Sequence, residues 1–243
     1  MVIHSLSFGQ QQARERWNTR ESGAAFDRKK FPYLTRQAQD FLMQQSFCVI
    51  AGSGPDRELA GLLAPGRPGF VQILDQSTFV FQLERQFMPA RLLEGLSQTL
   101  EHGVSEQLAF CFICHPTRER LCVQGSASLL TSNGLNRLSS HAPFEQMEVR
   151  VQVREAFFHC TKYIKTRVAG LTNPIDPFLE EARSSQSVLD SSMTALTAET
   201  RAFIQKRSLC FLCTRNAQGL TAINHRGGAP GFLVTVPPEE STS

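Results

Sequence analysis

The sequence lacks any apolar run long enough to cross a membrane, and it lacks a strong excess of charge. Its formal net charge is +3, and its 25 lysine and arginine residues are scattered rather than clustered. A membrane helix needs about 20 consecutive apolar residues, and nucleic-acid binding usually requires a basic patch or stripe. The first residues, MVIHSL, also lack the basic region and long apolar core of a secretory signal. These absences predict a cytoplasmic protein that binds neither membranes nor nucleic acid.

Cysteine gives no sign of a disulfide framework, because its count is odd. The seven cysteines lie at positions 48, 111, 114, 122, 160, 210 and 213. Most fall within apolar stretches, which is typical of reduced, buried thiols. Cys111 and Cys114, like the pair at 210 and 213, have the spacing of zinc ligands, but residues three apart on a strand point to opposite faces. We therefore expect no metal site.

The remaining composition is that of a folded protein with a real core. Hydrophobic residues make up 41% of the 243 positions and charged residues 19%, which is ordinary for one or two globular domains. Residues 147–154 alternate between apolar and polar side chains, as expected for a strand with one dry face. Further short strands are predicted at 47–51, 59–63, 70–74, 78–83, 107–114 and 120–128. Helices are predicted at 35–46 and 90–100, with a short one at 160–167.

An internal repeat organises the chain. A shift of 162 positions, without a gap, aligns two stretches of the sequence. The matched pairs are Phe41 with Phe203, Ser46 with Ser208, Cys48 with Cys210, Ala60 with Ala222, Gly66 with Gly228, and Pro68-Gly69-Phe70 with Pro230-Gly231-Phe232. Such self-similarity predicts that two stretches adopt the same structure. The second stretch ends before it has matched the later strands of the first.

The repeat and the composition together divide the chain into four parts. Residues 1–34 are expected to form a partly ordered arm that packs on the first domain. We call residues 35–168 copy 1 and residues 197–243 copy 2. Between them, residues 169–196 are rich in serine and contain two Asx-Pro pairs, which indicates a linker. The predicted fold is mainly β with peripheral helices: a six-stranded antiparallel split β-barrel plus an incomplete second copy.

The stretch NHRGGAPGF at residues 224–232 is the strongest candidate for a ligand site. Adjacent glycines allow the backbone to come close to a ligand, and an arginine provides a fork of donors for an anion. His225, Arg226, Gly227 and Gly228 are the predicted binding residues of this stretch. The alternatives are a tight turn with a surface arginine, and a His225 that only caps the end of a strand.

The same stretch resembles the flavin-binding split-barrel family related to pyridoxamine 5′-phosphate oxidase. In copy 2 the resemblance rests on FLCT at 211–214 followed by NHRGGAPGF. In copy 1 it rests on TRERLCVQGSA at 117–127 and on AFFHCTKYI at 156–164, where Thr161 stands in place of the family's proline. It covers residues 35–167 and, in part, 197–236. Copy 1 has LAPG at 63–66 where copy 2 has HRGG.

The resemblance implies a barrel that forms homodimers and binds FMN where two barrels meet. Larger relatives with two tandem copies can continue into a ferredoxin-reductase-like module that carries FAD. On this basis the chain is expected to be a flavin-dependent oxidoreductase of unknown substrate, with Lys162 reaching a flavin phosphate and no catalytic residue assigned. The alternative is a non-catalytic interaction module with a degenerate flavin site. Arg118 and Arg120 are interpreted as a solvated face, and Cys160, Lys162 and Tyr163 have a purely structural alternative.

Overall fold

The computed structural model describes residues 6–54, 58–85, 88–102, 105–130, 146–161, 164 and 196–235. Its helices are α1 (Phe8–Arg16), α2 (Arg20–Asp27), α3 (Arg36–Met43), α4 (Ala90–His102) and α6 (Ala198–Gln205). Its strands are β1 (Phe47–Ser53), β2 (Leu59–Pro65), β3 (Val71–Ile73), β4 (Thr78–Glu84), β5 (Glu106–Cys114), β6 (Glu119–Leu130), β7 (Gln146–Phe158), β8 (Leu209–Arg215) and β9 (Thr221–Gly227). Among these helices, none is long and apolar enough to cross a membrane.

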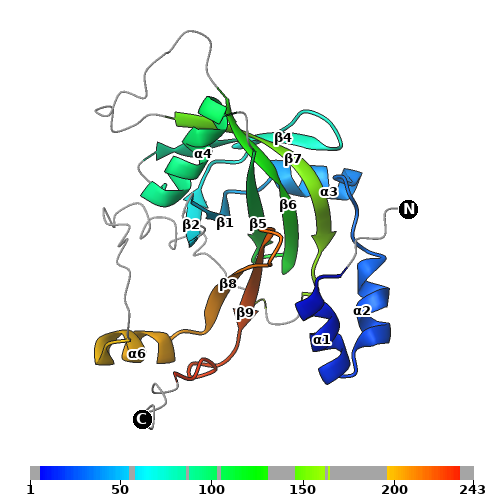
Figure 1. The fold of residues 1–243 in the computed structure, drawn as a ribbon, viewed down its shortest axis with the longest axis vertical. Helices are drawn as coiled ribbons and strands as arrows, with labels where there is room; N and C mark the ends of the chain where they lie inside the picture. The colour runs from blue at the N-terminus through cyan, green and yellow to red at the C-terminus, as the bar shows by residue number, and fades with distance from the viewer. Residues whose placement is uncertain are drawn as a thin grey trace.

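Copy 1 is a strongly curved antiparallel sheet of seven strands in the order β2-β1-β5-β6-β7-β4-β3, seen in Figure 1. The fold is therefore mainly β, and its split-barrel character confirms the predicted class, with seven strands in place of the expected six. The short β3 adds the seventh strand by pairing with β4. The predicted helix over 160–167 falls mostly outside the described residues.

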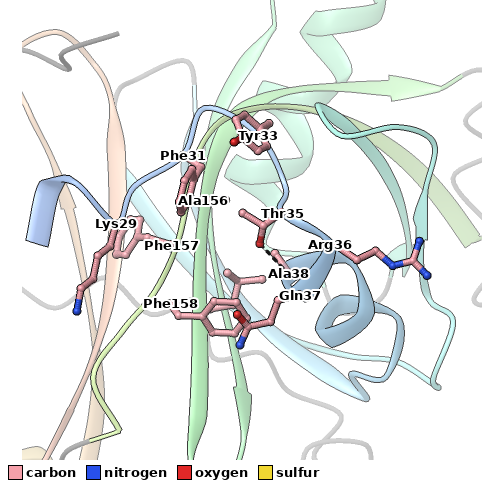
Figure 2. Close-up of a pocket in the computed structure, with 11 residues that line it drawn as sticks. Lys29, Phe31, Tyr33, Thr35, Arg36, Gln37, Ala38, Ala156, Phe157 and Phe158 are labelled. Carbon is pink, nitrogen blue, oxygen red and sulfur yellow. Dashed lines mark hydrogen bonds between the residues drawn. The ribbon is translucent and has the colours of Figure 1, made fainter. Parts of the chain in front are cut away.

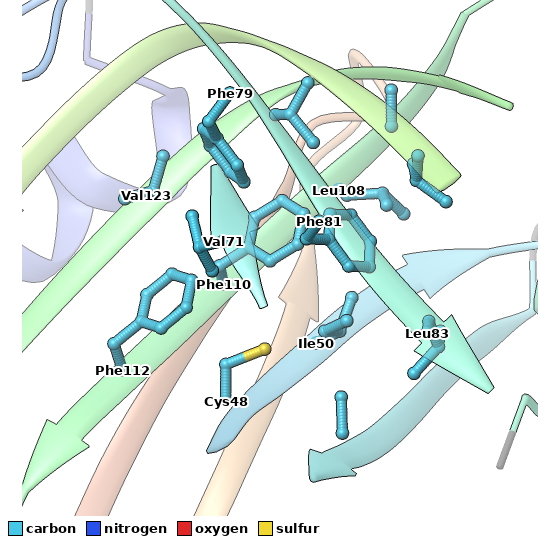
Figure 3. Packing of buried hydrophobic residues seen from close by; sticks show 14 of the residues in the cluster. Cys48, Ile50, Val71, Phe79, Phe81, Leu83, Leu108, Phe110, Phe112 and Val123 are labelled. Atoms are coloured by element: carbon cyan, nitrogen blue, oxygen red, sulfur yellow. The ribbon is translucent and has the colours of Figure 1, made fainter. Parts of the chain in front are cut away.

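Phenylalanine rings fill the inside of the curved sheet. Phe79, Phe81 and Phe110 meet edge to face, with ring centroids 5.5 Å apart for Phe79–Phe110 and 5.3 Å apart for Phe81–Phe110 (Figure 3). These arrangements suit the charge distribution of aromatic rings. Helix α3 closes one side of this core with Ala38, Phe41 and Leu42, a spacing that places all three on one helical face. We call this the inner cluster.

Strand β1 is buried on both faces, because a second apolar cluster lies on the outside of the sheet. Cys48 and Ile50 point into the inner cluster, whereas Phe47, Val49 and Ala51 point outward. The outer cluster has the following buried members: Phe47, Val49, Ala51, Ala109, Cys111, Ile113, Cys122, Phe157, Ile164 and Ile223. Cys111 lies in the outer cluster and Cys114 packs against the inner one, so this Cys-x-x-Cys pair does face opposite ways. Cys160, by contrast, is exposed.

Copy 2 repeats the first three elements of copy 1 with the same spacing. Thr35 caps α3 by accepting a hydrogen bond from Ala38 N, and Thr197 caps α6 by accepting one from Thr200 N. The β1–β2 hairpin pairs Phe47 with Pro65, and the β8–β9 hairpin pairs Leu209 with Gly227. All of these partners are 162 positions apart, so the repeat found in the sequence is also a repeat of backbone structure.

The N-terminal arm is more regular than the sequence suggested. Helix α1 begins with a capping box between Ser7 and Gln10, and α2 is joined to it by an ion pair of 2.8 Å between Arg14 and Asp27. The arm packs on copy 1 through a bridge between Phe31 and Ala156. These short helices escaped prediction because neither has a buried residue, and hence neither has a clear apolar stripe.

Candidate functional site

The two copies meet where the β8–β9 hairpin covers the outer cluster of copy 1, below β5 in Figure 1. Ile223 of β9 is buried in that cluster, with Phe211 and Cys213 of β8 packed against it. Thr221 Oγ1 donates a hydrogen bond of 2.5 Å to Gln107 O on β5. The hairpin is therefore held by apolar contact and by polar contact. Toward the end of β9 the contacts between the copies are polar. We call this region, around Arg120 and His225, the junction.

At the junction a buried arginine of copy 1 holds a buried histidine of copy 2. Arg120 on β6 and His225 on β9 are each only 4% exposed. Arg120 Nη1 donates to His225 O at 3.0 Å and lies 3.2 Å from His225 Nδ1, while Nη2 donates to Cys160 O at 3.4 Å. A guanidinium group can only donate, so Nδ1 of His225 is an acceptor and its ring proton is on Nε2.

His225 is kept neutral by its surroundings. Burial, and then the nearby Arg120, lower the pKa of His225 to about 4. The same two causes lower the pKa of His159 to about 4. His159 Nε2 lies 3.4 Å from Asn224 Nδ2, so two neutral imidazoles flank the junction. Near neutral pH, neither contributes positive charge.

The junction instead draws its positive charge from two arginines. Arg226 Nη1 donates to His225 O at 3.4 Å, the same carbonyl oxygen that accepts from Arg120. Both guanidinium groups therefore reach the same carbonyl oxygen, although like charges repel. Among the described residues neither forms an ion pair with a carboxylate. The buried Glu155 on β7 forms its ion pair with Lys30, at 3.2 Å.

Two buried polar atoms at the junction have no hydrogen-bond partner among the described residues. They are Arg120 Nε, a donor, and Asn224 Oδ1, an acceptor. A buried polar group without a partner is costly, and such groups often mark a site that a ligand or water completes. Two adjacent cations and an unused arginine donor together favour an anionic group such as a phosphate.

One aromatic side chain from the arm, Phe26, lies beside the junction. The ring of Phe26 on α2 lies 5.4 Å from that of Phe157 and 5.2 Å from that of His159. Lys30 lies over the Phe157 ring at 5.1 Å. The N-terminal arm therefore contributes to the surroundings of His159, a role that was not predicted from the sequence.

The predicted binding residues of copy 2 fall into two groups. His225 and Arg226 lie at the junction, with His225 buried and Arg226 exposed at the surface. Gly227 ends β9 opposite Leu209. Binding by these residues remains a prediction. Lys162, the remaining predicted residue, lies outside the described residues.

Gly228 has a structural reason to be glycine. Its N–H donates to Ser208 O at 3.0 Å, and a Cβ on it would lie 2.6 Å from Cβ of Phe232. The equivalent Gly66 donates to Ser46 O at 2.8 Å and leaves the same lack of room beside Phe70. The shared Gly-x-Pro-Gly-Phe turn is therefore a packing motif in both copies. Anion binding by the N–H of Gly228 stays a prediction.

The interpretation of Arg120 as a solvated residue was wrong. Its side chain is buried because β9 docks on the strand that carries it. One signal in the sequence could have indicated this. The residues that follow Arg120, LCV at 121–123, are all apolar, so both faces of the strand are apolar there. A strand that is apolar on both sides is covered on both sides. Arg118 is exposed, as expected, and its Nε donates to Ile164 O at 3.0 Å.

A separate groove of about 440 Å³ lies between the arm, the start of α3 and the end of β7. Figure 2 shows that aromatic side chains line it, among them Phe31, Tyr33 and Phe158. Its charged side chains, Lys29 and Arg36, are exposed. The groove has the size and apolar lining of a ligand pocket, but its lining contains no buried ionisable group. The junction is therefore the stronger candidate site.

The fold and the junction thus define a split-barrel protein in which a partial second copy completes the outer face of the first. No protein-family model matches the sequence, and no curated protein matches it. The comparisons that do give matches are those with solved structures, and those matches are pyridoxamine 5′-phosphate oxidase-family and related split-barrel proteins.

Three of these solved structures illustrate the range. A Lactobacillus delbrueckii protein assigned as a pyridoxamine 5′-phosphate oxidase is 16% identical, with a TM-score of 0.37, and the match covers 53% of this chain and 98% of that one. An FAD-binding protein of Mycobacterium smegmatis is 14% identical, with a TM-score of 0.34 and coverage of 52% and 95%. The heme storage protein HutZ of Vibrio cholerae is 18% identical, with a TM-score of 0.34 and coverage of 51% and 93%.

Proposed function

We propose that the chain binds a flavin nucleotide at the junction of its two copies, and that it is a flavin-dependent oxidoreductase. The observation that supports this most directly is the pair of guanidinium groups, Arg120 and Arg226, which converge on one carbonyl oxygen without a carboxylate partner among the described residues. Such a pair fits the phosphate of FMN, or of FAD. The resemblance of residues 224–232 to the flavin-binding family supports the same ligand.

The proposal resolves a difficulty in the sequence. Copy 1 has a full sheet but lacks the arginine-glycine motif, and copy 2 has the motif but lacks the later strands. At the junction the motif of copy 2 meets β6 of copy 1, so one composite site is assembled from both. In the equivalent site with the two copies exchanged, Leu63 of copy 1 would take the place of His225. It would have to meet a strand that copy 2 does not contain among its described residues. We therefore expect one flavin for each chain.

Each residue has a distinct part in this site. Arg120 and Arg226 bind the anionic group, and the neutral His225 offers its Nε2–H as a donor, since only Nδ1 is engaged by Arg120. Arg120 Nε and Asn224 Oδ1 supply a further donor and acceptor. A bound flavin would itself supply the hydride chemistry, and the protein would supply placement and hydrogen bonds.

The test is a comparison of FMN with riboflavin, which lacks the phosphate. Arg226→Gln is the main variant, because Arg226 is exposed and its loss should not affect folding. The wild-type protein should bind FMN more tightly than riboflavin, and the variant should lose at least about tenfold of that preference, the equivalent of one charge-assisted hydrogen bond. Arg36→Gln, which removes an exposed arginine of α3, is the control.

Flavin fluorescence quenching or calorimetry gives both affinities. Arg120→Gln should show the same loss of preference for FMN, provided that its thermal unfolding confirms a folded protein. A colourless protein that takes up neither added FMN nor added FAD would contradict the proposal. Equal binding of FMN and riboflavin by the wild type would place the flavin elsewhere than beside the two arginines.

A further inference from the structure

Copy 2 presents an apolar surface that its counterpart in copy 1 buries. Leu212 on β8 is 51% exposed, whereas the equivalent Ile50 on β1 is 1% exposed. Phe203 on α6 is 58% exposed, whereas the equivalent Phe41 on α3 is 8% exposed. Leu196 repeats the contrast with the fully buried Leu34. We call Leu196, Phe203 and Leu212 the open face.

Leu212 of the open face lies on the opposite side of the hairpin from copy 1. Phe211 and Cys213 of β8 pack against the outer cluster, and Leu212 between them points the other way. In copy 1 the same direction leads to the inner cluster, which β4, β5 and β7 complete. Within the described part of copy 2 no such strands exist, and α6 has no buried residue. Figure 1 shows α6 standing away from the barrel.

Strand β8 also has a free edge among the described residues. Its sheet contains only β8 and β9. In copy 1 the same edge of β1 pairs antiparallel with β5, matching Val49 with Cys111, Ile50 with Phe110 and Ala51 with Ala109. The backbone of this repeat is therefore already seen to accept an antiparallel strand there. The equivalent residues on β8 are Phe211, Leu212 and Cys213.

Apart from Arg215 at its end, the sequence of β8 does nothing to protect this edge. Residues 209–214, LCFLCT, contain no charged residue and no proline. Natural edge strands usually carry charges, proline or bulges that prevent pairing with another chain. On β9, by contrast, the inward residues of copy 1, Leu62 and Ala64, are replaced by Asn224 and Arg226. Because Asn224 pairs with Leu212, this side of the hairpin is apolar on β8 and polar on β9.

We propose that the open face is a dimer interface, and that its occupant is the β8 strand and α6 helix of a second copy of this chain. An antiparallel strand pair can be related by a twofold axis, so an unprotected edge can pair with its own copy. The β1–β5 pairing is centred on Ile50, and its equivalent on β8 is Leu212. We therefore place the axis near Leu212, which faces Leu212 of the partner subunit. Two hairpins then form one four-stranded sheet, and both α6 helices cover the β8 residues at its centre.

This interface differs from a pairing through the outer face of the barrel. The outer cluster of copy 1 is already occupied by the hairpin of the same chain, so it is not available to a second chain without displacing that hairpin. The open face, in contrast, combines half-exposed large side chains with unpaired backbone groups in the described part of the chain. The inference does not depend on flavin binding, because it rests on the exposure of Leu212 and on the unpaired edge of β8 rather than on Arg120 or His225.

The test is sedimentation velocity of the purified full chain over roughly 1–100 µM, the range in which weak to moderate dimers dissociate. Leu212→Lys places two like charges opposite each other at the axis and should weaken the dimer at least about tenfold. Leu74→Lys is the matched control, because Leu74 is 57% exposed and follows β3 of copy 1. It should leave the dimer unchanged. Because both leucines are half exposed, both variants should unfold at nearly the wild-type temperature.

Hydrogen exchange of the β8 amides adds a second readout. In a dimer, amides along the free edge should exchange more slowly at high than at low protein concentration. A wild-type chain that stays monomeric over this range overturns the proposal. So does a dimer that Leu212→Lys leaves intact. Slow β8 exchange in a monomer would mean that another segment of the same chain covers the edge, and that also overturns it.

Discussion

At the scale of single residues, the most informative side chain is Arg120. It is a buried cation whose nitrogens bind the carbonyl oxygens of His225 and Cys160. Arg120→Gln should lower the free energy of unfolding by about 2–3 kcal/mol, because hydrogen bonds to a charged group are lost and buried acceptors are left unpaired. Urea denaturation measures this change. Arg36→Gln, at an exposed surface pair, should change it by less than about 0.5 kcal/mol. Equal effects of the two substitutions would show that Arg120 does not hold the copies together.

His225 should make folding stability depend on pH. Its pKa is about 4 in the folded protein, against about 6.5 for an unperturbed histidine. The unfolded chain therefore binds more protons between these values, so stability is complete above pH 6.5 and is lost as the pH falls towards 4. At pH 5 the loss for this one residue reaches about 2 kcal/mol. Urea denaturation at pH 7.5 and pH 5 should show a smaller decrease for His225→Gln than for the wild type. An unchanged decrease would mean that other groups cause the pH dependence.

What the sequence could predict at this scale follows from what is local. The turn of Gly66 and Gly228 was visible because its glycines, proline and phenylalanine recur at a fixed distance. The contact between Arg120 and His225 was not, because it joins residues 105 positions apart and depends on how the hairpin docks. Arg120 lies near the start of β6 and follows polar residues in the sequence. Its side chain is buried because β9 covers it.

At the scale of elements, the repeat provides paired experiments. A Cβ on Gly66 would lie 2.3 Å from the Phe70 ring, and one on Gly228 would lie 2.6 Å from Phe232. Phe70 is buried in the inner cluster, whereas Phe232 is only partly buried. Gly66→Ala should therefore destabilise the protein by about 2–3 kcal/mol, and Gly228→Ala by less, because the second ring can move aside more easily. Thermal unfolding with calorimetry measures both.

The control for these substitutions is Gly9→Ala. Nothing lies within 4 Å of a Cβ at Gly9, which is on helix α1. This change should be neutral or slightly stabilising, because alanine favours a helix over glycine by up to about 1 kcal/mol. If Gly228→Ala proved as costly as Gly66→Ala, the turn of copy 2 would be as tightly packed as that of copy 1.

The same elements show how far prediction from pattern extends. The strand alternation and the repeat predicted nearly every strand of copy 1 and the hairpin of copy 2, since both depend on spacing along the chain. They did not predict the helices of the arm, which are held by caps and ion pairs rather than by an apolar stripe. The strand predicted at 70–74 is β3, which the structure shortens to Val71–Ile73.

At the scale of the whole molecule, the two faces of the β8–β9 hairpin have opposite parts to play. Ile223 is buried against copy 1, and Leu212 is directed away from it. Ile223→Asp should undock the hairpin, because an unpaired charge cannot remain in the outer cluster. Hydrogen exchange should then show loss of protection in β9, while β4, β6 and β7 stay protected by their own inner cluster. Leu212→Asp introduces the same charge on the opposite face and should leave β9 protected. If both variants behaved alike, the hairpin would not be docked through the face that carries Ile223, and the composite site at the junction would be lost with it.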